Sequence, residues 1–284
     1  MDLSKDISAA ELQFREKLEY YLISIFKDTI IDSHGLAHHR RVWNHAKDLL
    51  LYPEIGNRIK DGSFPLKLLI GSYLHDSGMV RERGPRHGSF SRDCTLDFLA
   101  ASNISAADNE DLLAAVENHD NKEYSLKQER SLLHEILSIA DDLDALGYIG
   151  IYRYIEIYLM RDVKYHDLGN EIIRNVTGRF DNFRRTFAGI PKLIARYNPG
   201  FETIRGFFEK YNMQMTGYKF GSAFPAGYCA VAEIISNMIK NNLKLEDVIE
   251  DSLEDPDRVI SWYFGELKRE MNVDGAGNGM TVTF

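Results

Sequence analysis

Residues 65–78 read Pro-Leu-Lys-Leu-Leu-Ile-Gly-Ser-Tyr-Leu-His-Asp-Ser-Gly, an apolar helical pattern that ends in two polar residues. The leucines and the tyrosine recur at the spacing of a helix, and Gly78 is typical of a helix C-terminus. The pattern predicts an apolar helix with His75 and Asp76 near its end. Because that end of a helix carries partial negative charge and unpaired carbonyls, a bound cation is favoured there.

Histidines gather on both sides of this stretch. Four of the nine lie within residues 32–45, and His119 closes a second amphipathic stretch at residues 112–120. A solvated helix face rarely carries so many imidazoles, and neutral imidazole is a common metal ligand. Eight of the nine histidines fall between His34 and His134, so we expect the chemistry in the first 165 residues.

Three carboxylates stand inside the otherwise apolar stretch Ile139-Ala-Asp-Asp-Leu-Asp-Ala-Leu146. Asp141 and Asp144 are three residues apart and share a helix face, whereas Asp142 is predicted to be exposed. A buried carboxylate is costly unless it is paired or coordinates a metal. Nitrogen and oxygen ligands drawn from several helices would offset that cost and would suit Mn, Fe, Zn or similar ions.

Helical periodicity extends over most of the 284 residues, and only seven prolines interrupt it. Ser8 with Glu11 has the spacing of a capping box at the start of the first helix. Further helices are expected near residues 90–101, 106–119, 131–146 and 150–161, and apolar stripes continue beyond residue 165. Strand signals are nearly absent. The sequence therefore predicts an all-α fold.

Composition narrows the classes of function. With 44% hydrophobic and 27% charged residues, the chain has enough apolar material for a sizeable core. A net charge of −9 argues against broad nucleic-acid binding, although a few local arginines would still allow a small anionic substrate. Two cysteines fit a reducing compartment, and we see neither a signal peptide nor an apolar run of the ~20 residues that span a bilayer. We expect a cytoplasmic protein without membrane contact.

The order of the histidine and aspartate motifs resembles the HD-domain metal-dependent phosphohydrolase superfamily. The resemblance covers residues 30–160 and rests on His38-x-x-Arg41-Val42, Leu74-His75-Asp76-x-Gly78, His119 and Ala140-Asp141-x-x-Asp144-Ala145-Leu146. It implies an all-helical HD-domain bundle whose members mostly cleave phosphate esters or anhydrides of nucleotides. Here the bundle would carry an additional C-terminal helical region.

The resemblance also implies a ligand set. The four residues common to the superfamily correspond to His38, His75, Asp76 and Asp141. Members with two metals add two histidines, and His87 and His119 stand in the matching order. The gap before His87 is short, so this residue is either a second-metal ligand or a helix cap. His119 is either a second-metal or substrate residue or a histidine that contacts a helix-terminal carbonyl.

Other polar residues receive roles around these ligands. We assign catalytic roles to Asp76, His119 and Asp144. Asp144 has two alternatives: it supports the metal ligands from behind, or it forms an ion pair on the surface. Substrate binding is assigned to His34, Arg41, Arg81, Arg83 and Arg86. The alternatives are a loop histidine for His34, a carboxylate partner for Arg41 and a solvated loop for the arginine run. His39 points about 100° away from His38 on a helix and is predicted to face solvent.

These assignments predict that the protein is a metal-dependent phosphohydrolase, which acts on a small phosphorylated or anionic substrate through a metal-activated water. One or two divalent transition-metal ions, Mn, Fe, Ni, Co or Zn, with Mg as a further option, would lower the pKa of that water toward ~7. The alternatives are an HD-type di-iron oxygenase acting on a small substrate and a regulatory module that binds a nucleotide without turning it over.

Three regions are expected along the chain. Residues 1–29 would form an N-terminal helix packed on the HD core, and residues 30–165 would form the metal-binding catalytic domain. Residues 166–284 would form a C-terminal helical extension that caps the cavity or provides the interface of a homodimer.

Overall fold

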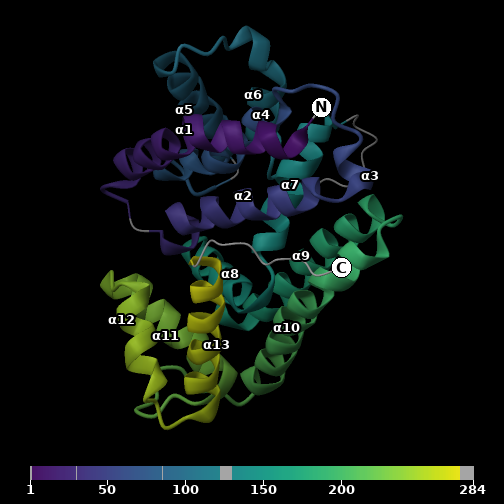
Figure 1. Ribbon diagram of the computed structural model, residues 1–284. Coiled ribbons are helices and arrows are strands. Elements are labelled where there is room, and N and C mark those ends of the chain that lie inside the picture. The colour runs from purple at the N-terminus through teal and green to yellow at the C-terminus, as the bar shows by residue number, and fades with distance from the viewer. Residues whose placement is uncertain (1, 30, 85, 122–129, 276–284) are drawn as a thin grey trace. The chain divides into compact units, whose positions relative to one another are not determined.

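A computed structural model describes residues 2–29, 31–84, 86–121 and 130–275 (Figure 1). It is 77% helical, with 13 α-helices and no strand among these residues, so the all-α prediction is confirmed. The described part contains no helix that is both long enough and apolar enough to cross a membrane.

The chain forms two compact units. The first contains residues 1–144 and 178–196, and the second contains residues 145–177 and 197–284. The first unit ends at Asp144, and the chain returns to it at Gly178. The functions predicted for residues 30–165 and 166–284 stay predictions.

The first unit contains the long N-terminal helix and the elements that carry the clustered histidines. Its elements are α1 (Leu3–Phe26), η1 (Asp32–His34), α2 (Leu36–Leu50), α3 (Pro53–Gly56), α4 (Phe64–Leu74), η2 (Ser77–Val80), α5 (His87–Ala101), η3 (Ala107–Asn109), α6 (Glu110–Asn118) and α7 (Leu132–Asp144). The second unit contains α8 (Gly147–Met160), α11 (Gly227–Asn241), α12 (Leu245–Leu253) and α13 (Arg258–Gly275). Two helices, α9 (Tyr165–Thr186) and α10 (Pro191–Met215), contribute residues to both units.

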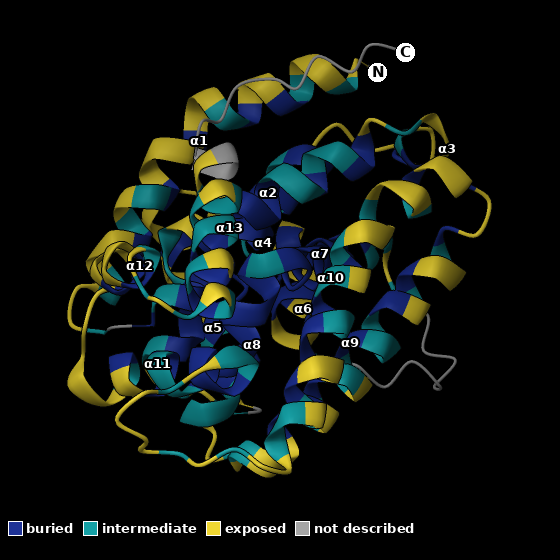
Figure 2. Cartoon of the chain, turned by 90° about the horizontal axis from the view of Figure 1, so that it is seen from below, coloured by how far each residue is buried: buried dark blue, intermediate teal, exposed yellow. Residues whose placement is uncertain are grey.

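Helix α4 is the centre of the first unit. It packs against α1, α2 and α7, and most of its residues are buried, as the dark blue of this helix in Figure 2 shows. A helix that is apolar on all sides is stable only when neighbours cover each face. The helix ends at Leu74, before the predicted Gly78, and the chain continues through His75 and Asp76 into the short helix η2.

The first helix begins earlier than its sequence pattern suggests. Helix α1 starts at Leu3, where the Asp2 side chain accepts a hydrogen bond from the Lys5 backbone N–H, so the capping box at Ser8 is wrong. Glu11 instead accepts hydrogen bonds from Trp43 Nε1 at 2.6 Å and Lys47 Nζ at 2.7 Å. The carboxylate that resembled a cap therefore joins α1 to α2.

Glu19 is a second carboxylate that joins α1 to its neighbours. It accepts hydrogen bonds from Arg40 Nε at 2.9 Å, Arg15 Nε at 3.0 Å and the Tyr73 hydroxyl at 3.0 Å. The hydrogen bonds from Arg40, together with those from Arg15 and Tyr73, lower the pKa of Glu19 to about 2 against the opposing effect of burial. Helices α1, α2 and α4 thus meet at one ionised group.

We expect the Glu19→Gln variant to be destabilised in a pH-dependent way. A lowered folded-state pKa contributes stability that is fully present above the unfolded value near 4.5 and is lost as pH falls toward 2. After allowance for solvent screening, the loss at pH 7 should be about 1–2 kcal/mol. Urea unfolding between pH 7 and pH 2.5 measures it, with exposed Glu16→Gln on the same helix as the control. A difference that stays constant as the pH falls would contradict this assignment.

Candidate metal centre

The ends of several helices bring polar side chains into the interior of the first unit. His38 lies in the first turn of α2, and His75 and Asp76 directly follow α4. Asp141 comes from the C-terminal half of α7. All four side chains are buried, and their ligand atoms lie within 4.8 Å of one another.

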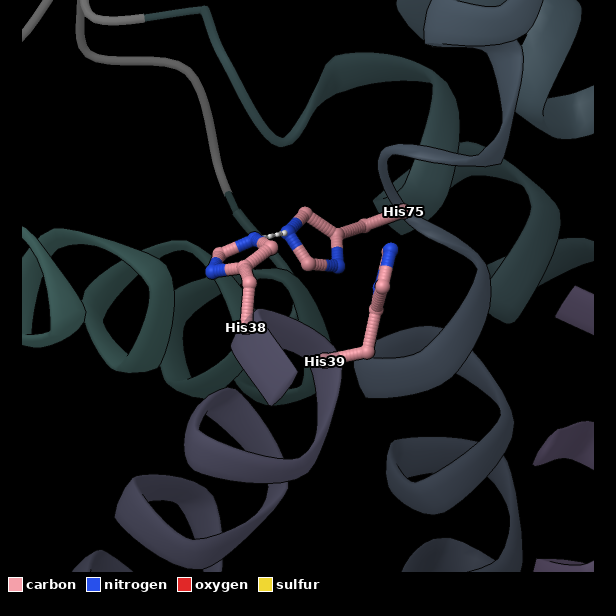
Figure 3. A group of neighbouring side chains, drawn as sticks. All are labelled: His38, His39 and His75. Atoms are coloured by element: carbon pink, nitrogen blue, oxygen red, sulfur yellow. Dashed lines mark hydrogen bonds between the residues drawn. The ribbon is translucent and has the colours of Figure 1, made fainter. Parts of the chain in front are cut away.

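The first cluster contains two imidazole nitrogens and two carboxylate oxygens. His38 Nε2 lies 3.1 Å from His75 Nε2, the contact drawn as a dashed line in Figure 3. Asp76 Oδ2 lies 3.3 Å from the first nitrogen and 3.4 Å from the second. Asp141 Oδ1 lies 3.8 Å from each of them. Four donor atoms thus surround one point: one from α2, one from α7 and two from the residues that follow α4.

The second cluster uses the other oxygen of Asp76. His119 Nε2 lies 3.0 Å from Asp76 Oδ1, and His87 Nε2 lies 3.3 Å from the same atom. The two imidazole nitrogens are 3.3 Å apart. Asp76 therefore belongs to both groups, with one oxygen facing each.

Two close backbone approaches place His87 at the start of α5. A Cβ atom on Gly78 would lie 2.1 Å from the carbonyl oxygen of His87, and one on Gly88 would lie 2.2 Å from the carbonyl oxygen of Glu117. Only glycine allows backbones to approach so closely. The first contact brings α5 against η2, and the second brings it against the end of α6, beside His119.

Each of the four clustered histidines uses its Nδ1 atom in a second hydrogen bond. Nδ1 lies 3.1 Å from the Ser72 carbonyl in His75, 2.7 Å from the Gly84 carbonyl in His87 and 2.7 Å from the Val116 carbonyl in His119. Since a carbonyl only accepts, the hydrogen-bond network assigns the proton to Nδ1 and leaves Nε2 of the neutral ring with a lone pair.

His38 is oriented by a carboxylate instead of a carbonyl. Its Nδ1 atom lies 2.8 Å from Asp144 Oδ2. Arg41 donates to the same carboxylate through Nε at 2.6 Å and Nη2 at 3.1 Å. Asp144 and Arg41 are both buried, so they form an internal pair behind His38. A carboxylate that fixes the outer nitrogen of a ligand histidine is common around protein metal sites.

The charges of the cluster favour a cation. Burial opposes ionisation of Asp76, but His75, His119 and His38 hold the pKa of this carboxyl well below its ordinary value. Burial also lowers the pKa of His75, yet the carboxylates of Asp76 and Asp141 raise it to about 10. The neighbouring imidazoles thus keep Asp76 ionised, and this carboxylate attracts positive charge.

The donor set fits divalent metal ions. Donor atoms around an ion with bonds of ~2.1 Å lie about 3.0–3.4 Å apart, close to most of the separations in both clusters. The Nε2 atoms of four imidazoles and the oxygens of two carboxylates converge here, and such groups repel one another unless a proton or a metal cation lies between them. Imidazole with carboxylate suits Mn, Fe, Co, Ni or Zn.

Comparison with known proteins agrees with this geometry. The model of the HD domain family matches residues 35–146. Residues 35–146 are therefore identified as an HD domain. Searches of curated proteins and of solved structures found no match. HD domains are associated with metal-dependent hydrolases, and all six clustered residues lie inside the matched segment of this chain.

Several other predicted site residues lie beside the clusters. His34 is buried, with its Nε2 atom 3.8 Å from Asp76 Oδ2 and its Nδ1 atom 2.7 Å from the Ser33 hydroxyl. Arg41 takes the alternative predicted for it, since its guanidinium binds Asp144. The surface pair considered for Asp144 is wrong because this carboxylate is buried.

The arginine run of the HD domain lies on the protein surface. Arg86 pairs with Glu82 at 2.8 Å, and Arg81 lies 3.8 Å from Asp93. Arg83 is exposed as well. A substrate-binding role for Arg81, Arg83 and Arg86 stays a prediction.

Two exposure predictions within the HD domain are wrong. His39 is fully buried, because the side of α2 that carries it is also covered: its ring lies beside His75 and Phe26, and its Nδ1 atom is 3.4 Å from the Ser72 carbonyl (Figure 3). Asp142 is buried too. It accepts a hydrogen bond at 2.7 Å from Arg179 of α9, a residue beyond the HD domain that no local motif marks.

Proposed function

We propose that this protein is a metal-dependent phosphohydrolase that cleaves a phosphate ester or anhydride of a nucleotide or related small molecule. The observation that carries the proposal is the position of Asp76, whose two oxygens face separate groups of buried donors within an HD domain. A carboxylate shared in this way suits two ions held a few ångströms apart, as in two-metal phosphatases.

His38, His75, Asp141 and Asp76 would hold one ion, and His87, His119 and Asp76 would hold the other. When bound, the ions supply an activated water and polarise a phosphoryl oxygen. Asp144 holds His38 in the orientation that directs Nε2 into the cluster, and the carbonyls of residues 72, 84 and 116 do the same for the other imidazoles. His34, whose Nε2 atom lies 3.8 Å from Asp76, would contact the substrate.

A small substrate is favoured over a nucleic acid. The chain has a net charge of −9, and nucleic-acid binding requires clustered basic residues to neutralise phosphates. Bound ions would supply the positive charge that the phosphate of a small molecule needs. Arg81, Arg83 and Arg86 could add charge at the surface, although two of them already pair with acids.

An HD-type di-iron oxygenase is the second candidate, and the histidine-rich ligand set is compatible with it. Four imidazoles with two carboxylates suit iron as well as manganese or zinc. Such a protein would consume oxygen with a small substrate instead of releasing phosphate. A nucleotide-binding module without turnover, the third reading, would be stabilised by its ligand without forming product.

Elemental analysis with an activity screen tests these functions. The protein would be purified without chelator and then reconstituted with Mn, Fe, Co, Ni or Zn. About two ions per chain and phosphate release from a panel of phosphate esters and anhydrides support the proposal. Two irons with oxygen uptake and no phosphate release would favour the oxygenase. Failure to retain any metal after reconstitution would rule out both enzymes.

We expect the Gly88→Ala variant to lose one of the two ions. The new methyl group would meet the Glu117 carbonyl at 2.2 Å, so α5 must move away from α6 and carry His87 with it. Overpacking of this kind costs about 1–3 kcal/mol. Metal content per chain after dialysis measures the effect, with Gly206→Ala as the control because no atom lies within 4 Å of its added Cβ. Retention of both ions by Gly88→Ala would show that His87 is not needed.

A further inference from the structure

Two of the clustered residues are each followed in the chain by an aspartate that belongs to neither cluster. Asp142 follows Asp141, and Asp120 follows His119. Both of these following aspartates contact Arg179: Nη1 donates to Asp142 Oδ1 at 2.7 Å, and Nη2 donates to Asp120 Oδ1 at 3.3 Å. One guanidinium therefore contacts the segment that carries a donor of the first cluster and the segment that carries a donor of the second.

Arg179 also faces the donor residue Asp141 itself. Its Nη1 atom lies 3.6 Å from Asp141 Oδ2, while Asp141 Oδ1 faces the Nε2 atoms of His38 and His75 at 3.8 Å. One oxygen of this carboxylate thus faces the two imidazoles, and the other faces the guanidinium. Because a guanidinium is planar and presents its donors in a fixed fork, it restricts the orientation of the carboxylates around it.

The surroundings make this arrangement tight. Asp142 is 4% exposed and needs a compensating cation, and the Arg179 side chain is 16% exposed. Both residues, and the clusters, belong to the first compact unit. Arg179 reaches them from α9, outside the segment that matches the HD domain.

We propose that Arg179 is a positioning residue of the metal centre, which holds Asp141 with one oxygen toward His38 and His75 and ties the end of α6 to α7. This inference rests on the proposed function, because it assigns Arg179 to the same metal site. Removal of the guanidinium frees Asp141 to turn and so weakens metal binding. Loss of a supporting residue behind a metal ligand typically costs about 10–100-fold in affinity.

The test must separate positioning from simple charge compensation, because Arg179→Met leaves Asp142 buried without its cation. The double variant Arg179→Met/Asp142→Asn removes that buried charge. Arg184→Met is the matched control, since Arg184 lies on the same helix in the same unit and is exposed, 3.8 Å from Asp181.

Chelator-treated wild type and variants would be titrated with Mn²⁺ by calorimetry and unfolded in urea without metal. The Co²⁺ absorption spectrum at saturation would report the coordination of the ion. We expect Arg179→Met to be less stable and to bind Mn²⁺ about 10–100-fold more weakly. The double variant should recover stability but keep the weak binding and an altered Co²⁺ spectrum, while Arg184→Met should match the wild type.

Two outcomes would overturn the inference alone. One is wild-type Mn²⁺ affinity in Arg179→Met. The other is recovery of both stability and affinity in the double variant, which would make Arg179 only a partner for Asp142. A wild-type protein that retains none of Mn, Fe, Co, Ni or Zn would overturn the proposed function and this inference together.

Discussion

An Asp76→Asn protein is expected to retain its fold, lose both metal ions and lose at least about 1000-fold in phosphatase activity, the rate equivalent of ~4 kcal/mol of transition-state stabilisation. The reason is that Asp76 supplies one oxygen to each donor cluster. An asparagine has the same shape, but its amide nitrogen cannot coordinate and its oxygen carries no charge. No other single substitution among the donors would affect both clusters directly.

Metal content per chain and phosphate release from the best substrate measure this effect. His119→Ala provides the comparison, because it removes a donor of the second cluster and leaves the four donors of the first intact. Asp93→Asn on the exposed face of α5 is the control for a lost carboxylate. Two ions and wild-type activity in Asp76→Asn would refute the shared role of this residue.

The second large effect concerns Asp144. Asp144→Asn should destabilise the metal-free protein by about 3–5 kcal/mol, because it leaves the buried Arg41 guanidinium without its carboxylate. The substitution also leaves one acceptor oxygen where the carboxylate has two, so His38 and Arg41 can no longer both keep their contacts. We therefore expect metal affinity to fall by about 10–100-fold as well.

Urea unfolding in the presence of a chelator measures the stability change, and Mn²⁺ titration measures the affinity. The control is Asp48→Asn, which breaks the partly exposed ion pair with Arg196 and should cost less than about 1 kcal/mol. If Asp144→Asn costs no more than Asp48→Asn, the buried pair contributes little and the assigned role of Asp144 fails.

Residues that are close in the chain could be placed from the sequence. The apolar pattern of residues 65–78 located His75 and Asp76 at the end of a helix, because the helix and its polar terminus are adjacent. Asp141 and Asp144 were likewise assigned from their spacing within one helix. These residues are adjacent or lie within one helix, so helical periodicity alone predicts their relative positions.

Relations across the fold were less accessible. Only 11 positions separate Asp76 from His87, a short distance for two ligands of one site. The close contact at Gly78 lets η2 and α5 pack tightly enough to bring both side chains together. Helix geometry separates His38 and His39 by about 100°. That angle does not predict the burial of His39, because other parts of the fold cover both sides of α2 at this point. Arg179 could not be assigned because it lies 37 residues beyond Asp142, where no periodic pattern connects the two.

The shared position of Asp76 has a thermodynamic consequence for loading. An ion bound at either cluster would order this carboxylate and thereby remove part of the entropy cost of ordering it for the other. Such coupling is reciprocal, so each ion would raise the affinity for its neighbour by the same factor. Loading would then be cooperative: at limiting metal, the population would divide into empty and fully loaded chains, with few molecules holding a single ion.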